Sequence, residues 1–248
     1  MRIILLDLKK YRIISDIFRA IIVLALVLGT TLIGANAYFT SDEYVNALIE
    51  ESEKSIIIID AGHGGEDCGA VGVTGVYEKD LNLIIAKEIG DLLSNEGYAV
   101  VYTRQDDRLL YRENENIKGL RKISDLKNRC KIAAEYPNAL FISIHMNSYS
   151  NAKYSGLQVY YSPEDEDSRM LAAAIQNSVK DSLQTDNNRK IKKGDGLYVL
   201  ENVDNTAVLV ECGFITNPLE CQKLCEKEYQ KSLSFSIFCG IIEYIRSN

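Results

Sequence analysis

The chain has 248 residues, a formal net charge of −7, 46% apolar residues and 25% charged residues, a composition typical of a globular protein. The negative charge, and the lack of basic clusters beyond the N-terminal segment, argue against a nucleic-acid-binding protein. The sequence contains no phosphate-loop or dinucleotide-binding fingerprint. A chain of this length is expected to fold around one large core.

The N-terminal segment is basic and then apolar. Basic residues precede an apolar stretch at 20–34, and an A-x-A pattern ends at Ala37. This order is typical of a signal peptide cleaved after Ala37, although the long basic part also suits an uncleaved membrane anchor. We therefore predict that residues 1–37 direct export across the cytoplasmic membrane. Residues 38–54 are predicted to form a polar linker and residues 55–248 the folded domain.

Apolar periodicity and turn residues predict strands that alternate with helices along the folded domain. The predicted strands span residues 56–59, 98–103, 140–145, 156–161, 197–200 and 207–211. The predicted helices span residues 79–95, 120–135, 165–183 and 219–246. Longer loops are expected at 62–75, 106–119 and 186–195. This alternation predicts an α/β fold, an open three-layer sandwich with a largely parallel, twisted central sheet flanked by helices.

The two histidines of the chain each follow an apolar run, His63 after the first predicted strand and His145 at the end of the third. Open α/β sheets bind ligands at the carboxyl edge of their strands, so we expect the two imidazoles to lie together there. A catalytic zinc site needs three protein ligands and one open position. The acids near His63 that offer a third ligand are Asp60, Glu66, Asp67, Glu78 and Asp80. Residue chemistry does not choose among them. The helix dipole stabilises an acid in the first turn of a helix, so Glu78 could have this structural role without binding a metal.

Glu211 ends the apolar run at 207–210. An ionised carboxylate at the tip of a buried strand is costly unless it has a partner or a function. The alternative is an exposed acid at a strand end. We favour a functional acid, because three strands would then deliver His63, His145 and Glu211 to one edge of the sheet.

Three ordered motifs resemble the signatures of the zinc-dependent N-acetylmuramoyl-L-alanine amidases of type 3. They are D-A-G-H-G-G at 60–65 with Glu78, S-I-H-M-N at 143–147, and V-E-C-G-F at 210–214. The resemblance spans about residues 56–245. It implies hydrolysis of the amide bond between the lactyl group of N-acetylmuramic acid and the L-alanine of the stem peptide in peptidoglycan.

The resemblance also implies roles for individual residues. His63, Glu78 and His145 would hold one Zn²⁺ per chain, and Glu211 would be the catalytic glutamate. Further candidates for substrate contact are Asn147, Arg104 and Arg129. Strand-end packing is the alternative role for the asparagine, and a structural ion pair is the alternative for each arginine.

A single domain behind an export segment resembles the sporulation amidases that prepare muramic-δ-lactam in spore cortex for germination. A vegetative role in cell separation or autolysis is the alternative. The resemblance implies action outside the cytoplasm, in the cell wall or between the forespore membranes. Membrane anchoring through residues 20–34 and an activating protein partner of unknown identity are further expectations.

Three rival functions follow from the same residues. A cysteine hydrolase would use Cys212 or Cys68 with His145. A zinc peptidase would cut within the stem peptide, and a non-catalytic module would only bind the wall. The spacing of the six cysteines gives no disulfide framework, so we expect free thiols.

Overall fold

The computed structural model describes residues 19, 21, 22, 24, 25, 28–31, 56–111, 114, 117 and 120–248. The chain divides into two units, residues 1–52 and Glu53–Asn248. The described residues of the first unit are helical. In the described part of the chain, no helix combines the length and apolar character needed to cross a bilayer. The predicted linker and most of the predicted export segment lie outside the described residues, so both stay predictions.

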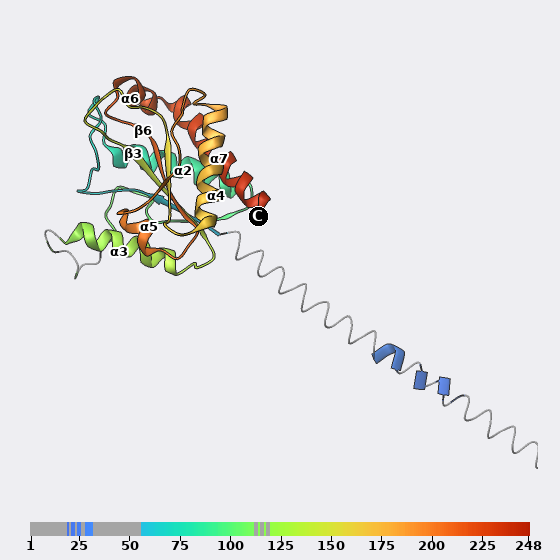
Figure 1. The fold of residues 1–248 in the computed structure, drawn as a ribbon. Coiled ribbons are helices and arrows are strands. Elements are labelled where there is room, and N and C mark those ends of the chain that lie inside the picture. Colours follow the sequence, from blue (N-terminus) through green and yellow to red (C-terminus); the bar gives the residue numbers. More distant parts are fainter. Residues whose placement is uncertain are drawn as a thin grey trace, which may run out of the picture. The chain divides into compact units, whose positions relative to one another are not determined.

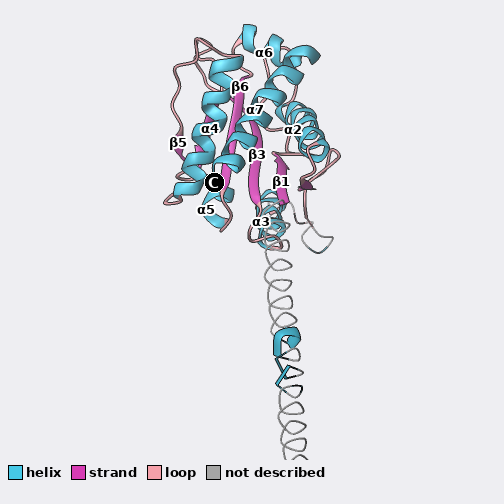
Figure 2. Cartoon of the chain, turned by 90° about the vertical axis from the view of Figure 1, so that its right-hand side faces the viewer, coloured by secondary structure: helices cyan, strands magenta, loops and turns pink. Residues whose placement is uncertain are grey.

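A six-stranded mixed sheet lies at the centre of the second unit (Figures 1 and 2). Its strands are β1 (Ile56–Ala61), β2 (Ala99–Tyr102), β3 (Leu140–Asn147), β4 (Gln158–Tyr161), β5 (Lys192–Lys193) and β6 (Ala207–Phe214). They follow the order β2-β1-β3-β6-β4-β5. Neighbouring strands are parallel except at β4 and β6, which pair antiparallel. The predicted α/β fold with a largely parallel sheet is therefore confirmed.

Helices lie on both faces of this sheet, and Figure 2 looks onto one of these faces. The helices are α2 (Glu78–Asn95), α3 (Arg121–Ala134), α4 (Glu166–Ser182), α5 (Tyr198–Asn202), α6 (Pro218–Cys225) and α7 (Lys227–Ser247). Successive strand residues point to opposite faces, so β1 contributes to two cores. Ile57 and Ile59 pack in the core that includes α2, α4 and α7, whereas Ile58 packs in the core that includes α3 and α5. These two cores make the predicted three-layer sandwich.

Three local predictions are wrong. Residues 197–200 do not form a strand, because the chain enters the short helix α5 there. The predicted helix at 219–246 is two helices, since Glu226 is extended with φ −84° and ψ 123°. The apolar pattern of the predicted helix at 79–95 places Ile84 on its inner face, but Ile84 is 41% exposed. Val199 and Leu200 of α5 are nevertheless buried. The short helix therefore buries the apolar residues that the predicted strand was expected to bury.

Candidate active site

The candidate catalytic residues lie at the carboxyl ends of β1, β3 and β6. The register of β3 and β6 places His145 opposite Glu211. The backbone amide of Gly62 donates to the carbonyl of Ile144 at 3.0 Å, which carries the β1–β3 pairing past the end of β1. His63 follows at once, and its ring centroid lies 4.9 Å from that of His145. The two histidines therefore share one edge of the sheet.

Glu78, the first residue of α2, lies between the two imidazoles. Its Oε1 atom is 3.2 Å from Nε2 of His63 and 2.9 Å from Nδ1 of His145. The backbone amides of Ala70 and Met146 also donate to this carboxylate, at 2.8 and 3.1 Å. One candidate ligand atom from each of the three side chains lies within 4.8 Å of the others. Ligands about 2.0–2.1 Å from a tetrahedral zinc ion are about 3.4 Å apart, so the set fits such an ion.

Asp67 orients the first histidine. Its Oδ2 atom lies 2.9 Å from Nδ1 of His63, so that the Nε2 atom faces Glu78. A carboxylate behind a ligating imidazole fixes the tautomer and ring orientation. Burial lowers the pKa of His63, but hydrogen bonds to Asp67 and Glu78 outweigh it and raise the pKa to about 9. A metal ion that bound to His63 would therefore displace a proton.

Two glycines make room for the donor cluster. A Cβ atom on Gly62 would lie 2.2 Å from Nε2 of His145. A Cβ atom on Gly69, where φ is +64°, would lie 2.5 Å from Oε2 of Glu78. A side chain at either position would displace one of the candidate ligands.

Glu211 has a different environment from Glu78. Its Oε2 atom is buried and has no hydrogen-bond partner within the described residues. Burial raises the pKa of Glu211 to about 7, and the nearby charge of His145 only partly opposes this. A carboxyl group that titrates near neutrality can accept and return a proton, which is what a general base and acid must do.

Arg104 and Arg129 lie beneath the loop that carries His63, with exposed fractions of 1% and 2%. Arg104 donates to the carbonyls of Ala61 and Gly62, both at 2.9 Å. Arg129 donates to the carbonyls of Ala61 and His63 at 2.9 and 2.8 Å. These contacts make both arginines positioning residues. Their burial supports the structural alternative to a contact with substrate.

Asp60 completes this support. Its carboxylate accepts hydrogen bonds from Thr103 Oγ1 and Ser143 Oγ, both at 2.6 Å, and pairs with Arg129. Burial alone would raise the pKa of Asp60, but the Arg129 charge and the two hydroxyl groups lower it. Ser143, which lies two residues before His145, therefore holds the buried network together.

A cavity of about 260 Å³ opens beside His63 and His145, on the face of the sheet covered by α3 and α5. Apolar residues such as Leu126 and Leu197 form part of its wall. Asn147 is half-buried at the end of β3, and its carbonyl accepts from the Ile215 amide at 3.0 Å. A substrate contact through the Asn147 side chain stays a prediction.

The cysteines do not provide an alternative nucleophile of comparable quality. All six are free thiols, as expected. Cys212 is fully buried, and burial raises the pKa of its thiol well above the ordinary value. A reactive cysteine needs an accessible thiolate. Cys68 donates to the carbonyl of Gly69 at 3.3 Å.

Sequence reasoning missed two features of this site. Asp67 was one of the five acids considered as a third ligand, but only the fold shows that it contacts Nδ1 of His63. The second feature is the pair of buried arginines that bind loop carbonyls, because spacing along a chain does not reveal which carbonyls point inwards. The i, i+4 spacing of Asp125 and Arg129 on one helix was the available signal for a structural ion pair.

Two imidazoles and a carboxylate at the edge of an α/β sheet, with a second carboxylate alongside, are typical of metal-dependent hydrolases. Residues 57–243 match the family described as N-acetylmuramoyl-L-alanine amidase. The chain therefore belongs to the N-acetylmuramoyl-L-alanine amidase family and is a peptidoglycan hydrolase.

Individual relatives agree with this assignment. The chain is 36% identical over 189 residues to the germination-specific N-acetylmuramoyl-L-alanine amidase of Bacillus subtilis (strain 168), covering 76% of this chain and 79% of that protein. Its fold is similar to the CwlD amidase from Clostridioides difficile, solved in complex with the GerS lipoprotein, with a TM-score of 0.75 and 37% identity over 78% of this chain and 99% of that one. The amidase AmiC2 of Nostoc punctiforme gives a TM-score of 0.67 and 32% identity, covering 78% and 98%.

Proposed function

We propose that this amidase depends on zinc, with one Zn²⁺ held by His63, Glu78 and His145 and with Glu211 as catalytic base and acid. The observation that carries the proposal is the spacing of the three donor groups, which lie within 4.8 Å of one another. Imidazole nitrogen and carboxylate oxygen are ligands that zinc prefers in catalytic sites. Glu211 adds support, because its buried Oε2 atom has no hydrogen-bond partner within the described residues. Burial of such a group destabilises the fold, which is expected only where the group has a function.

Glu211 and Asp67 have different roles in the proposed hydrolysis. When bound, zinc supplies the Lewis acidity that acidifies water and polarises a carbonyl. Glu211 takes a proton from the attacking water and then delivers it to the nitrogen of L-alanine, so that the stem peptide leaves as an amine. A pKa raised by burial to about 7 suits transfer in both directions. Asp67 keeps the His63 ring in its ligating orientation.

The test combines metal content with product analysis for the full chain. Peptidoglycan digested by zinc-loaded protein is expected to yield free lactyl groups and peptides that begin with L-alanine, as read by mass spectrometry. Glu211→Gln should retain zinc and lose about 10²–10⁴-fold in turnover. Near-normal activity would remove Glu211 from the mechanism. A zinc peptidase would instead release fragments cut within the stem, and a wall-binding module would release none.

The proposed setting is the spore cortex, where removal of the stem peptide would allow muramic-δ-lactam to form. Support comes from the 36% identity to a germination-specific amidase. The alternative is vegetative cell separation or autolysis, since the chain is also 31% identical to the amidase LytC of Bacillus subtilis (strain 168), of which it covers 40%. Cortex muropeptides of a deletion strain decide between them. Loss of muramic-δ-lactam supports the cortex role, and chained cells with normal cortex support the alternative.

The proposed location is outside the cytoplasm, in the cell wall or between the forespore membranes, with membrane anchoring through residues 20–34. The similarity to cell-wall amidases supports this location. We also propose an activating protein partner, supported by the related amidase solved with a lipoprotein. Fractionation of cells that express the full chain tests the anchor, and affinity purification from sporulating cells tests the partner.

A further inference from the structure

Arg189 lies close to the catalytic face of the sheet. One terminal nitrogen of its guanidinium donates to Oε1 of Gln158 at 2.8 Å. The guanidinium carbon lies 4.7 Å from the ring centroid of Phe214. Gln158 is the direct register partner of Glu211 in the β4–β6 pair, and such partners have Cβ atoms about 4.5–5.5 Å apart. One side chain, Gln158, therefore separates Arg189 from Glu211.

Gln158 and the ring of Phe214 hold the guanidinium of Arg189 in place. Its Nε atom is buried, and nothing in the described ranges accepts a hydrogen bond from it. Arg104 and Arg129 differ, because their Nε and terminal nitrogens all donate to carbonyls or carboxylates. Arg189 is half-buried, and a planar guanidinium fixed on an aromatic ring is suited to binding a carboxylate through its terminal nitrogens.

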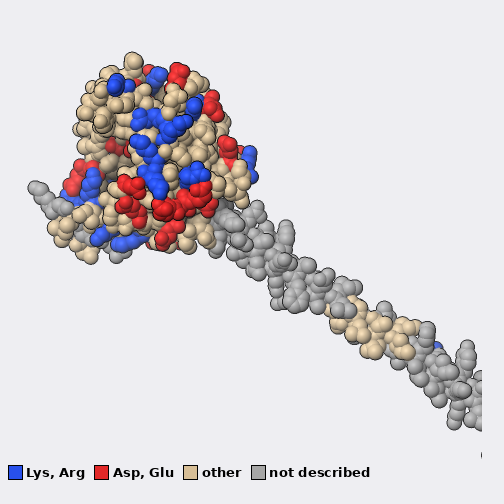
Figure 3. Space-filling view, in the orientation of Figure 1, with Lys and Arg blue, Asp and Glu red and all other residues tan. Residues whose placement is uncertain are grey.

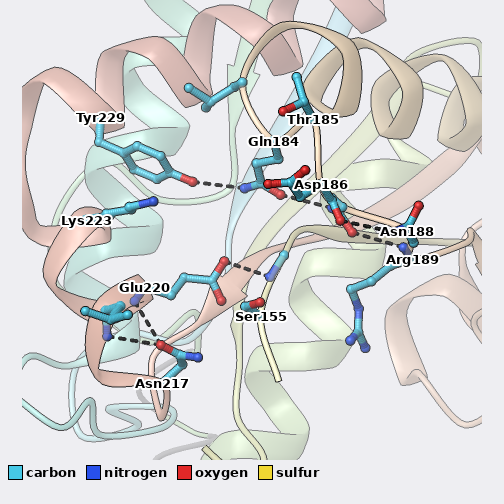
Figure 4. A pocket seen from close by; sticks show the side chains of 14 residues that line it. Ser155, Gln184, Thr185, Asp186, Asn188, Arg189, Asn217, Glu220, Lys223 and Tyr229 are labelled. Atoms are coloured by element: carbon cyan, nitrogen blue, oxygen red, sulfur yellow. Dashed lines mark hydrogen bonds between the residues drawn. The ribbon is translucent and has the colours of Figure 1, made fainter. Parts of the chain in front are cut away.

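A second cavity, of about 510 Å³, has Arg189 in its wall. Figure 4 shows Lys223 and Tyr229 on one side and Asp186, Asn188 and Arg189 on the other. This cavity shares no wall residue with the cavity beside His63 and His145. Its polar walls suit a peptide better than an apolar ligand.

Two acids, Glu220 and Asp186, line this cavity together with Arg189 and Lys223. Glu220 points inwards and accepts from the backbone amides of Gly156 and Phe214 at 2.8 and 2.7 Å. Burial raises its pKa, so its tendency to carry a negative charge is weakened. Lys and Arg side chains also gather in a band on the face drawn in Figure 3, although the chain as a whole carries a charge of −7. Such a band would attract an anionic substrate.

We propose that Arg189 binds a carboxylate of the stem peptide on the leaving-group side and that the 510 Å³ cavity receives this peptide. The inference rests on the proposed function, which places the scissile amide at Glu211. Each extended residue spans about 3.3–3.6 Å, so the residue after L-alanine reaches about 7 Å from that amide. Arg189 hydrogen-bonds to Gln158, the register partner of Glu211, so a peptide that continues past L-alanine on this side can approach it. Arg189 sets the preference for free over amidated carboxylates.

The test compares two soluble muropeptides that differ only at the residue after L-alanine, with a free carboxylate in one and an amide in the other. The wild type should favour the free acid by about tenfold in kcat/KM, the effect of one charge-assisted hydrogen bond. Arg189→Gln should remove the preference by raising KM for the acid alone. Lys190→Gln, an exposed neighbour with the same loss of charge, should keep it.

Equal kcat/KM for both substrates with the wild type overturns the inference, whether or not the variant folds. Equal losses on both substrates in Arg189→Gln would likewise assign the residue a structural role. Arg189→Lys keeps the charge and should retain part of the preference. Inactivity of zinc-loaded wild type on both muropeptides would instead refute the proposed function.

Discussion

Replacing Glu211 with glutamine is expected to stabilise the metal-free protein while it lowers turnover by about 10²–10⁴-fold. Burial raises the pKa of Glu211 to about 7 from an ordinary 4.5. The unfolded chain therefore loses this proton at a lower pH than the folded chain does. The resulting free energy is present below pH 4.5 and is lost as the pH rises towards 7. A gap of about 2.5 pH units corresponds to roughly 3 kcal/mol.

Urea unfolding of chelator-treated protein at pH 5 and pH 8 measures this effect. The unfolding free energy of Glu211→Gln relative to wild type should increase by about 2 kcal/mol between the two conditions. Glu243→Gln, which removes an exposed carboxylate on α7, should show no comparable change. A difference between Glu211→Gln and wild type that does not vary with pH would refute the claim that burial holds this carboxyl group protonated.

Three further substitutions test the parts around the donor cluster. Asp67→Asn should weaken zinc binding by about 10–100-fold in a chelator competition, because His63 loses its orienting carboxylate; unchanged affinity would contradict this. Gly62→Ala should retain the fold by circular dichroism but lose zinc, since its Cβ would lie 2.2 Å from the His145 ring; a fully loaded variant would count against the geometry. Arg129→Met should lower the unfolding free energy by about 3–5 kcal/mol in urea, because two buried carboxylates lose their partner; a loss below about 1 kcal/mol would show that they do not depend on it.

The position of the site could be predicted from the sequence because strand ends are well defined. Each histidine follows a short apolar run, and parallel strands bring their carboxyl ends to one edge. The choice of Glu78 as third ligand needed the family resemblance, since five acids lie near His63 in the sequence. The fold shows why it differs from the others: the first turn of α2 places it between both rings.

Other features depended on contacts that local patterns do not encode. Residues 197–200 form a short apolar run, which periodicity cannot assign to a strand or to a helix. The break at Glu226 has neither glycine nor proline to mark it. The sequence around Arg189 is typical of an exposed basic loop. Its hydrogen bond with Gln158 joins residues 31 positions apart, which no local pattern predicts. Only the pairing of β4 with β6 brings that contact beside Glu211.

The central claim is that three side chains at this edge hold a zinc ion for amide hydrolysis. A crystal of the zinc-soaked protein, measured above and below the zinc absorption edge, tests it most directly. The account predicts one anomalous peak per chain, in contact with Nε2 of His63, Nδ1 of His145 and the carboxylate of Glu78, with Glu211 close by but not coordinated. A peak bound elsewhere, or none at this position, would contradict it.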